Sequence, residues 1–172
     1  MSATVHPSFS HSVRVYWEDT DAGGVVYYAN YLKFFERART EWLRSLGVNQ
    51  QTLKDETGGV FVVSDAAIKY HRSARLDDQL TITAGLQHVG KACVVFVQQA
   101  RRGGLDGELL AEATIRVGWV QAQTMRPARI SATISSTGEM GTGWRELFME
   151  CLLGRELDAM HCSRRLAHDT HQ

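Results

Sequence analysis

Apolar and polar residues follow two different periods along the chain. Between Leu32 and Leu46, apolar residues recur every three or four positions, and charged residues occupy the remaining faces. This spacing predicts an amphipathic helix. Asn30 is placed to cap its N-terminus and Gly47 to end it, so we expect one helix of about four and a half turns at roughly 3.6 residues per turn.

Alternation with a period of two predicts strands on both sides of this helix. Val13, Val15 and Trp17 alternate with polar neighbours and predict the first strand. Further strands are expected over residues 61–70, 80–87, 93–97 and 115–119. Because these strands follow one another without intervening helices, the pattern favours an α+β domain. Its antiparallel sheet would pack on one helix, unlike a parallel doubly wound sheet.

The two ends of the chain differ from this central region. Residues 1–12 look like a flexible leader without the apolar block of a secretory signal, and residues 13–130 are expected to form the domain. Residues 131–172 begin as a linker rich in Ser, Thr and Gly and continue into a short amphipathic helix before a frayed end. That helix is expected to pack on its own domain or on a neighbouring subunit.

Composition excludes several classes of protein. The 172 residues are 44% hydrophobic and 22% charged, as expected of a soluble globular chain. The 19 basic residues balance the 19 acidic residues, so no global field exists to hold nucleic acid or an anionic membrane. No apolar run approaches the roughly 20 residues that cross a bilayer, and we expect a cytoplasmic protein. The chain has three cysteines, Cys93, Cys151 and Cys162. They are too few and too widely spaced for a disulfide framework or a zinc site.

The segment that leads into the predicted helix carries the candidate chemistry. It places Asp19 and Asp21 before a Gly-Gly turn. Helix N-termini have unpaired N–H groups that favour anions, and acyl transfer develops an oxyanion at the attacked carbonyl. A nearby carboxylate could attack that carbonyl or activate water. On turn frequencies alone, however, the two aspartates would only stabilise a turn or cap the helix.

The run DTDAGGVVYYANYLKFFERARTEWL, residues 19–43, resembles the motif of the hotdog-fold acyl-CoA thioesterases. The resemblance is to the tol-pal-associated branch, with 4-hydroxybenzoyl-CoA thioesterase as a more distant relative, and it extends from Val13 to about Ile130. It implies a hotdog fold, in which an antiparallel sheet wraps a long central helix. It also implies an acyl-CoA substrate and homodimers or homotetramers with active sites between subunits. Acyl carrier protein is a further candidate partner, and no cofactor or metal is expected.

The resemblance also implies catalytic roles for two residues. The family's catalytic carboxylate matches Asp21, and its backbone donor near the helix start matches Tyr28. The tol-pal branch commonly has His at the latter position, whereas this chain has the Tyr of the hydroxybenzoyl relative. A backbone N–H donor does not depend on the side chain. We therefore expect Asp21 to act as nucleophile or general base and the Tyr28 amide to polarise the carbonyl.

Three further residues are expected to contact the substrate. Asn30 either caps the helix or helps to orient the catalytic carboxylate, and the cap is favoured. Tyr27 could line the acyl pocket, although aromatic residues at helical spacing are more often in the core. Lys91 follows a Val-Gly turn, matches a basic position in the hydroxybenzoyl relative and could hold the phosphates of coenzyme A. Arg72 and Arg75 are weaker candidates for that role.

The predicted function is hydrolysis of an acyl-CoA thioester to free acid and coenzyme A. The alternative is a non-catalytic module of the cell envelope that binds acyl-CoA or acyl carrier protein. A hotdog dehydratase would need a His/acid pair near the central helix, and the sequence has no well-placed His there. His71 and His88 also lack a neighbouring nucleophile, so no catalytic triad is predicted.

Overall fold

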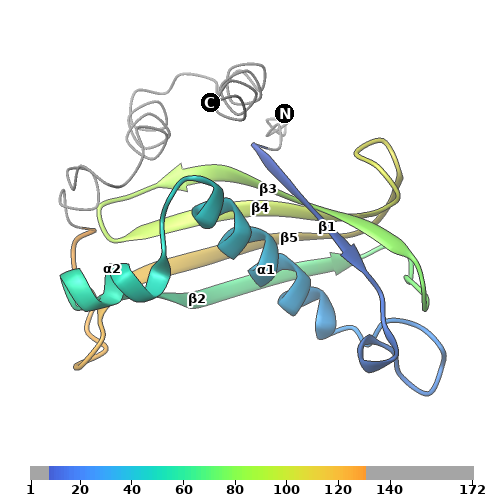
Figure 1. Cartoon of the computed structure of the whole chain (residues 1–172), viewed down its shortest axis with the longest axis horizontal. Helices are drawn as coiled ribbons and strands as arrows, with labels where there is room; N and C mark the ends of the chain where they lie inside the picture. The colour runs from blue at the N-terminus through green and yellow to red at the C-terminus, as the bar shows by residue number, and fades with distance from the viewer. Residues whose placement is uncertain (1–7, 131–172) are drawn as a thin grey trace, which may run out of the picture.

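The computed structural model describes residues 8–130, which form a five-stranded antiparallel sheet with two α-helices (Figure 1). The α+β prediction is therefore confirmed. The predicted linker and tail over residues 131–172, and the leader up to residue 7, lie outside the described residues. In chain order the elements are β1 (Phe9–Arg14), a 3-10 turn (Trp17–Asp19), α1 (Asn30–Ser45), α2 (Gln50–Thr57), β2 (Gly59–Tyr70), β3 (Gln79–Val89), β4 (Cys93–Arg102) and β5 (Glu108–Gln121).

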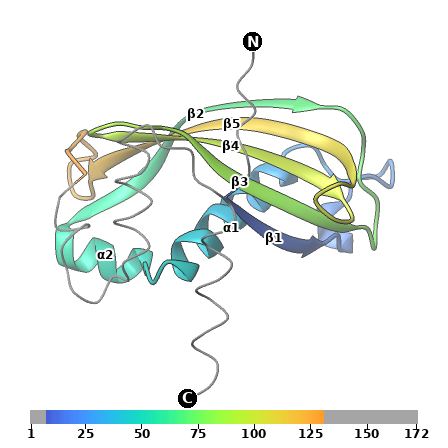
Figure 2. The ribbon, with the colours of Figure 1, turned by 90° about the horizontal axis from the view of Figure 1, so that it is seen from above.

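The strands lie in the order β1-β3-β4-β5-β2, and each neighbouring pair is antiparallel. β1 and β2 are therefore the two edges. Figure 2 shows the sheet curving over α1, with both helices on one face. β2 pairs with β5 over its whole length, from Gly59 opposite Gln121 to Tyr70 opposite Ala111. The predicted strands over 61–70 and 80–87 are confirmed, and β4 and β5 extend further than the pattern predicts.

The core lies between α1 and the concave face of the sheet. α1 contacts β1, β3 and β4, and its Phe34 and Phe35 side chains are completely buried. Burial of each such side chain stabilises the fold by about 1.5–3 kcal/mol. The predicted apolar stripe of the helix is confirmed except at Leu32, which is 41% exposed. Leu32 lies one turn before Glu36, which is also exposed, on the same flank of α1.

The first strand lies further toward the N-terminus than the alternation predicts. β1 begins at Phe9, so residues 9–12 belong to the sheet and not to the leader. Val15 is fully buried but has left the sheet, because its N–H and C=O bond to Asp78 and Asp77 in the loop before β3. Trp17 opens the 3-10 turn and is 79% exposed. Because Val15 is buried after β1 has ended, the alternation of apolar and polar residues wrongly predicts that the strand continues to Trp17.

The hydrophobic pattern does not predict α2, because Leu53 is its one buried residue. Local capping defines this helix. The Asn49 side chain accepts hydrogen bonds from the N–H groups of Gln51 and Thr52, and Gly58 ends the helix at φ +67°. Gly tolerates this left-handed conformation, which other residues rarely adopt.

Candidate active site

A short hairpin joins the 3-10 turn to α1 and carries most of the predicted site residues. The N–H of Asp21 donates to the carbonyl of Val25 at 2.9 Å, and the N–H of Tyr27 donates to the carbonyl of Asp19 at 2.9 Å. Gly24 lies in the turn at φ +73°, which requires the conformational freedom of glycine. The motif therefore folds back on itself immediately before the helix.

The two aspartates of the motif have different environments. Asp19 is 2% exposed, and its Oδ2 accepts a hydrogen bond from the N–H of Tyr16 at 3.0 Å. Asp21 is exposed, and its Oδ1 accepts from the N–H of Gly23 at 2.8 Å. Its Oδ2 has no hydrogen-bond partner among residues 8–130. Asp19 thus supports the local fold, whereas Asp21 keeps one carboxylate oxygen free for chemistry.

The start of α1 offers a free backbone donor. The N-cap position is Ala29, whose side chain cannot cap the helix. Within the described part of the chain, no acceptor takes the N–H of Tyr28, whose side chain is 60% exposed. The positive end of the helix dipole adds to the field of this amide. The arrangement can stabilise negative charge on a carbonyl oxygen that approaches from solvent.

The predicted role of Asn30 as N-cap is wrong. Asn30 is the first residue inside α1 and is 6% exposed. Its Nδ2 donates to the carbonyl of Asp19 at 2.9 Å, and its backbone N–H donates to the carbonyl of Tyr27 at 2.8 Å. An N-cap side chain would instead accept from N–H groups of the first turn. Asn30 therefore ties the helix start to the hairpin and does not touch the Asp21 carboxylate.

We expect Asn30→Asp to lower the free energy of unfolding by about 1–3 kcal/mol, because a buried carbonyl would lose its donor and face a carboxylate. Urea denaturation of the wild type and the variant measures this difference. An N-cap would tolerate the same substitution, because Asp caps helices as well as Asn does. Unchanged stability would therefore show that the Asn30 amide does not hold the hairpin to the helix.

Tyr70, at the end of β2, is a site neighbour that the sequence does not reveal. Its hydroxyl donates to the carbonyl of Tyr28 at 3.0 Å, and the two rings meet edge to face with centroids 6.3 Å apart. Burial raises the pKa of Tyr70 above its ordinary value, so the hydroxyl is protonated and able to donate at neutral pH. The two residues are 42 positions apart in the sequence, and no local pattern links them.

The other predicted aromatic residues divide between surface and core. Tyr27 is 43% exposed, and its ring centroid lies 4.7 Å from that of Tyr28, so both rings border open space beside the helix start. Tyr31, Phe34 and Phe35 are buried, as their helical spacing predicts. The Tyr31 hydroxyl accepts a hydrogen bond from the N–H of Ala74, and this contact anchors the loop between β2 and β3.

The structure does not bring Lys91 to the hairpin within one protomer. Lys91 is exposed in the turn between β3 and β4, whereas Val25 of the hairpin pairs with Arg75 just before β3. The 11 residues of β3 separate these two places by roughly 35 Å at about 3.3 Å per residue. Figure 1 shows the same separation, with the β3–β4 turn and the start of α1 at opposite ends of the molecule.

A cavity of about 130 Å³ lies between α1 and the half of the sheet next to the β2 edge. Arg39 borders it and donates to the Oε1 of buried Gln98 at 2.6 Å. Burial lowers the pKa of Arg39 from its ordinary value. The cavity therefore has an apolar floor and a polar rim. Its lining residues are Glu36, Arg39, Thr40, Leu43, Gln50, Phe61, Val63, Val94, Phe96 and Val117.

Other groups in the described part of the chain carry no evident chemistry. Within residues 8–130, no three His, Cys, Asp or Glu side chains gather to hold a metal ion. His71 Nε2 lies 3.1 Å from Glu112 Oε1, and Cys93 is a half-buried free thiol. Over the same residues, no helix combines the length and apolar character that crossing a membrane requires.

Comparisons with known proteins place this hairpin and helix in a family. The family model described as Thioesterase-like superfamily matches residues 15–137. The chain is 50% identical over 119 residues to the acyl-CoA thioesterase YbgC of Haemophilus influenzae, covering 69% of this chain and 85% of that protein. It is 43% identical over 126 residues to the acyl-CoA thioester hydrolase YbgC of Escherichia coli, covering 73% and 92%.

A solved structure agrees with these matches. The probable thioesterase of Bartonella henselae superposes with a TM-score of 0.66 at 33% identity, over 71% of this chain and 98% of that one. The matched range contains the hairpin, both α-helices and every strand except β1. The chain therefore belongs to the Thioesterase-like superfamily and has the hotdog fold.

Proposed function

We propose that this protein is an acyl-CoA thioesterase that hydrolyses an acyl-CoA to free acid and coenzyme A. The observation that carries the proposal is the N–H of Tyr28 at the start of α1, which has no acceptor among residues 8–130 and follows the hairpin that carries the exposed carboxylate of Asp21. The YbgC relatives, named as acyl-CoA thioesterases, support the same activity.

In the proposed mechanism, the Tyr28 N–H and the helix dipole bind the thioester carbonyl oxygen. This charge stabilisation strengthens as the oxygen becomes an oxyanion. The Asp21 carboxylate removes a proton from water while the water oxygen bonds to the carbonyl carbon. Collapse of the tetrahedral intermediate breaks the C–S bond, and the proton held by Asp21 goes to the departing thiolate. The products are the acid and the free thiol of coenzyme A.

The spacing within the hairpin favours this use of water over direct attack by Asp21. Asp21 lies opposite Val25 in the hairpin, and Tyr28 comes three steps after Val25 along the chain. Because Tyr28 lies in a turn, these three steps span at most roughly 10 Å, at about 3.3 Å per residue of extended chain. We infer that a carbonyl bound at the Tyr28 amide leaves room for a water molecule between it and the carboxylate. A mixed anhydride with Asp21 is the alternative course.

The outer edge of β2 is where a second copy would bind. The outer edge has no strand partner among residues 8–130, and residues 63–67 of β2 are exposed. Exposed apolar side chains lie at Val63 and Tyr70 of β2, at Tyr28 just before α1 and at Leu32 in its first turn. A long exposed edge with adjacent apolar surface is typical of a strand-pairing interface. We propose a dimer in which two copies of β2 pair antiparallel about a two-fold axis.

This dimer would complete the site. Gly59 of β2 lies at the end of the sheet that holds the β3–β4 turn, and Tyr70 lies at the end that holds the catalytic hairpin. Antiparallel pairing therefore brings the Lys91 end of one copy to the Tyr28 end of the other. There, Lys91 could hold a phosphate of coenzyme A. The cavity bordered by Arg39 and Phe61 would lie near the second copy's hairpin, where it could take the acyl group.

We expect the wild type to sediment as a dimer and the double variant Ala66→Lys/Ala67→Lys to sediment as a monomer, because lysines on an edge strand oppose pairing. The monomer should lose at least about tenfold in turnover, since each site would lack its second half. Ser10→Lys/Ser12→Lys, on the opposite edge strand β1, is the matched control and should stay dimeric. A monomeric, fully active wild type would contradict the proposal.

Release of free thiol tests the activity itself. Short aliphatic, long aliphatic and aromatic acyl-CoAs, together with an acyl carrier protein loaded with the same acyl groups, form the panel. Hydrolysis predicts equal amounts of free thiol and free acid from at least one member. Binding without thiol release would instead identify a non-catalytic acyl-binding module. An unsaturated acyl-CoA formed from a hydroxyacyl-CoA would identify a dehydratase.

A further inference from the structure

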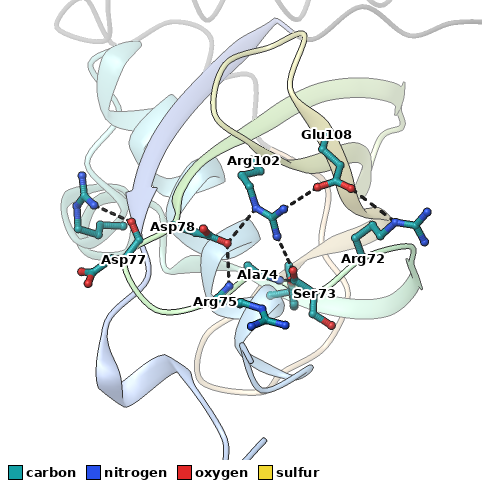
Figure 3. A network of polar contacts seen from close by, with 10 residues as sticks. Arg72, Ser73, Ala74, Arg75, Asp77, Asp78, Arg102 and Glu108 are labelled. Carbon is teal, nitrogen blue, oxygen red and sulfur yellow. Dashed lines mark hydrogen bonds and ion pairs between the residues drawn. The ribbon is translucent and has the colours of Figure 1, made fainter. Parts of the chain in front are cut away.

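A polar network centred on Arg102 lies beside the catalytic hairpin and was not predicted from the sequence (Figure 3). Arg102 is the last residue of β4, and its guanidinium makes three contacts in different directions. Nε donates to Asp78 Oδ2 at 3.0 Å, Nη1 to Glu108 Oε2 at 2.7 Å, and Nη2 to the carbonyl of Ser73 at 2.7 Å. The fork geometry of arginine suits such a junction, which a lysine cannot reproduce.

Two of these contacts fix the loop between β2 and β3. The loop comprises residues 71–78, so Ser73 lies near its start, and Asp78 ends it and also accepts from the N–H of Arg75 at 2.8 Å. Arg102 therefore holds both ends of one short loop against the β4–β5 hairpin. The third contact, to Glu108, joins the first residue of β5 to the last residue of β4.

The loop fixed by Arg102 is the surface on which the catalytic hairpin rests. Val26 donates from its N–H to the carbonyl of Ala74 at 2.9 Å, and Val25 forms an isolated bridge with Arg75. The N–H of Ala74 in turn donates to the Tyr31 hydroxyl at 3.1 Å, on the first turn of α1. Ala74 is completely buried, so this contact is shielded from water.

We propose that Arg102 is a positioning residue for the thioester hydrolysis proposed above. It acts through Ser73 and Asp78 on the loop, and the loop acts on the hairpin that presents Asp21 and the Tyr28 amide. Arg102 itself does not touch the substrate site. Because displacement of a reacting group by about 1 Å can cost about 100-fold in rate, a loosened loop lowers turnover without removing any catalytic group.

The test compares Arg102→Gln with Arg101→Gln. Arg101 lies next to Arg102 on the same hairpin, but among residues 8–130 its side chain bonds only Gln99 and Gly107. We expect Arg102→Gln to lower kcat by at least about tenfold. KM and the apparent pKa of the pH–rate profile should not change, because substrate contacts and the ionising carboxylate are intact. Arg101→Gln should keep the wild-type kcat. Equal kcat values for the two variants, after correction for folded fraction, would overturn the proposal.

A second measurement does not depend on thioesterase activity. Backbone hydrogen exchange of Val26 and Tyr27, whose N–H groups are hydrogen-bonded in the hairpin, should be faster in Arg102→Gln than in the wild type or Arg101→Gln, because the hairpin loses its fixed support. Unchanged exchange would overturn the proposal even if the protein hydrolysed no thioester. If Arg102→Gln showed faster exchange but the wild type hydrolysed no thioester, the proposed function would be rejected. The coupling of Arg102 to the hairpin would still stand.

Asp78→Asn is a second, milder change in the same network. Asparagine keeps an acceptor oxygen but removes the charge, so kcat should fall by less than in Arg102→Gln. Since both residues act through one loop, the double variant should lose no more than the stronger single variant. Losses that multiply would show that Arg102 and Asp78 act independently, which contradicts the proposal.

Discussion

Asp21→Asn is expected to lower kcat by at least about 100-fold, the usual scale for removing a general base or nucleophile. The carboxamide keeps an oxygen that can accept from the Gly23 N–H, so the turn should remain folded. It cannot take a proton from water at neutral pH. Steady-state release of coenzyme A thiol measures kcat, and thermal unfolding shows whether the variant remains folded.

Asp19→Asn is the matched control for that substitution, two residues away in the same motif. Asp19 is buried and accepts from the Tyr16 N–H, a role that an amide oxygen can also fill. We expect Asp19→Asn to lower the free energy of unfolding and to leave kcat per folded molecule close to that of the wild type. Near-normal hydrolysis by Asp21→Asn, or an equal loss of turnover from both variants, would refute the assignment of Asp21.

Tyr28→Pro is expected to lower kcat by about 100- to 1,000-fold, the effect of deleting one oxyanion donor. Proline removes the N–H that the mechanism requires. In the described structure that N–H has no acceptor, so its loss breaks no internal hydrogen bond. The position also precedes the helix, so the helical hydrogen bonds of α1 are retained. Thiol release and circular dichroism measure the two effects separately.

Tyr28→Ala is the control for the proline variant, because it removes the same ring but keeps the amide. Tyr28→Phe and Tyr28→His extend the series with side chains that also keep the amide. We expect all three to remain far more active than Tyr28→Pro. If Tyr28→Pro and Tyr28→Ala lost the same activity, the side chain and not the backbone N–H would be the important group.

The sequence was sufficient for the elements with strong periodicity. The stripe from Phe34 to Trp42 predicted α1, because side chains three and four positions apart share the buried face. Alternation predicted β2 and β3 in the same way. α2 escaped prediction because capping by Asn49, and not a buried face, defines it. Val15 misled the prediction because a loop buried it after β1 had ended.

The candidate site was predictable only along the motif. Local sequence placed Asp21 and Tyr28 in a turn that enters a helix, and the family resemblance supplied their roles. Tyr70 and Arg102 reach the hairpin through contacts across the sheet, which no spacing within the motif encodes. The N-cap role was assigned to Asn30 from its residue type. In the structure, Asn30 lies inside the helix and its side-chain amide donates to the carbonyl of Asp19.

The geometry of a bound substrate analogue tests the central claim most directly. In a ketone analogue of acyl-CoA, a methylene group replaces the sulfur, so the carbonyl remains but cannot be hydrolysed. A crystal structure of the full chain with this analogue should place the carbonyl oxygen about 2.7–3.1 Å from the Tyr28 nitrogen, the range for an oxyanion donor. The Asp21 carboxylate should face the carbonyl carbon, directly or across one water. A carbonyl bound away from the start of α1, or an Asp21 carboxylate turned away from it, would contradict the account.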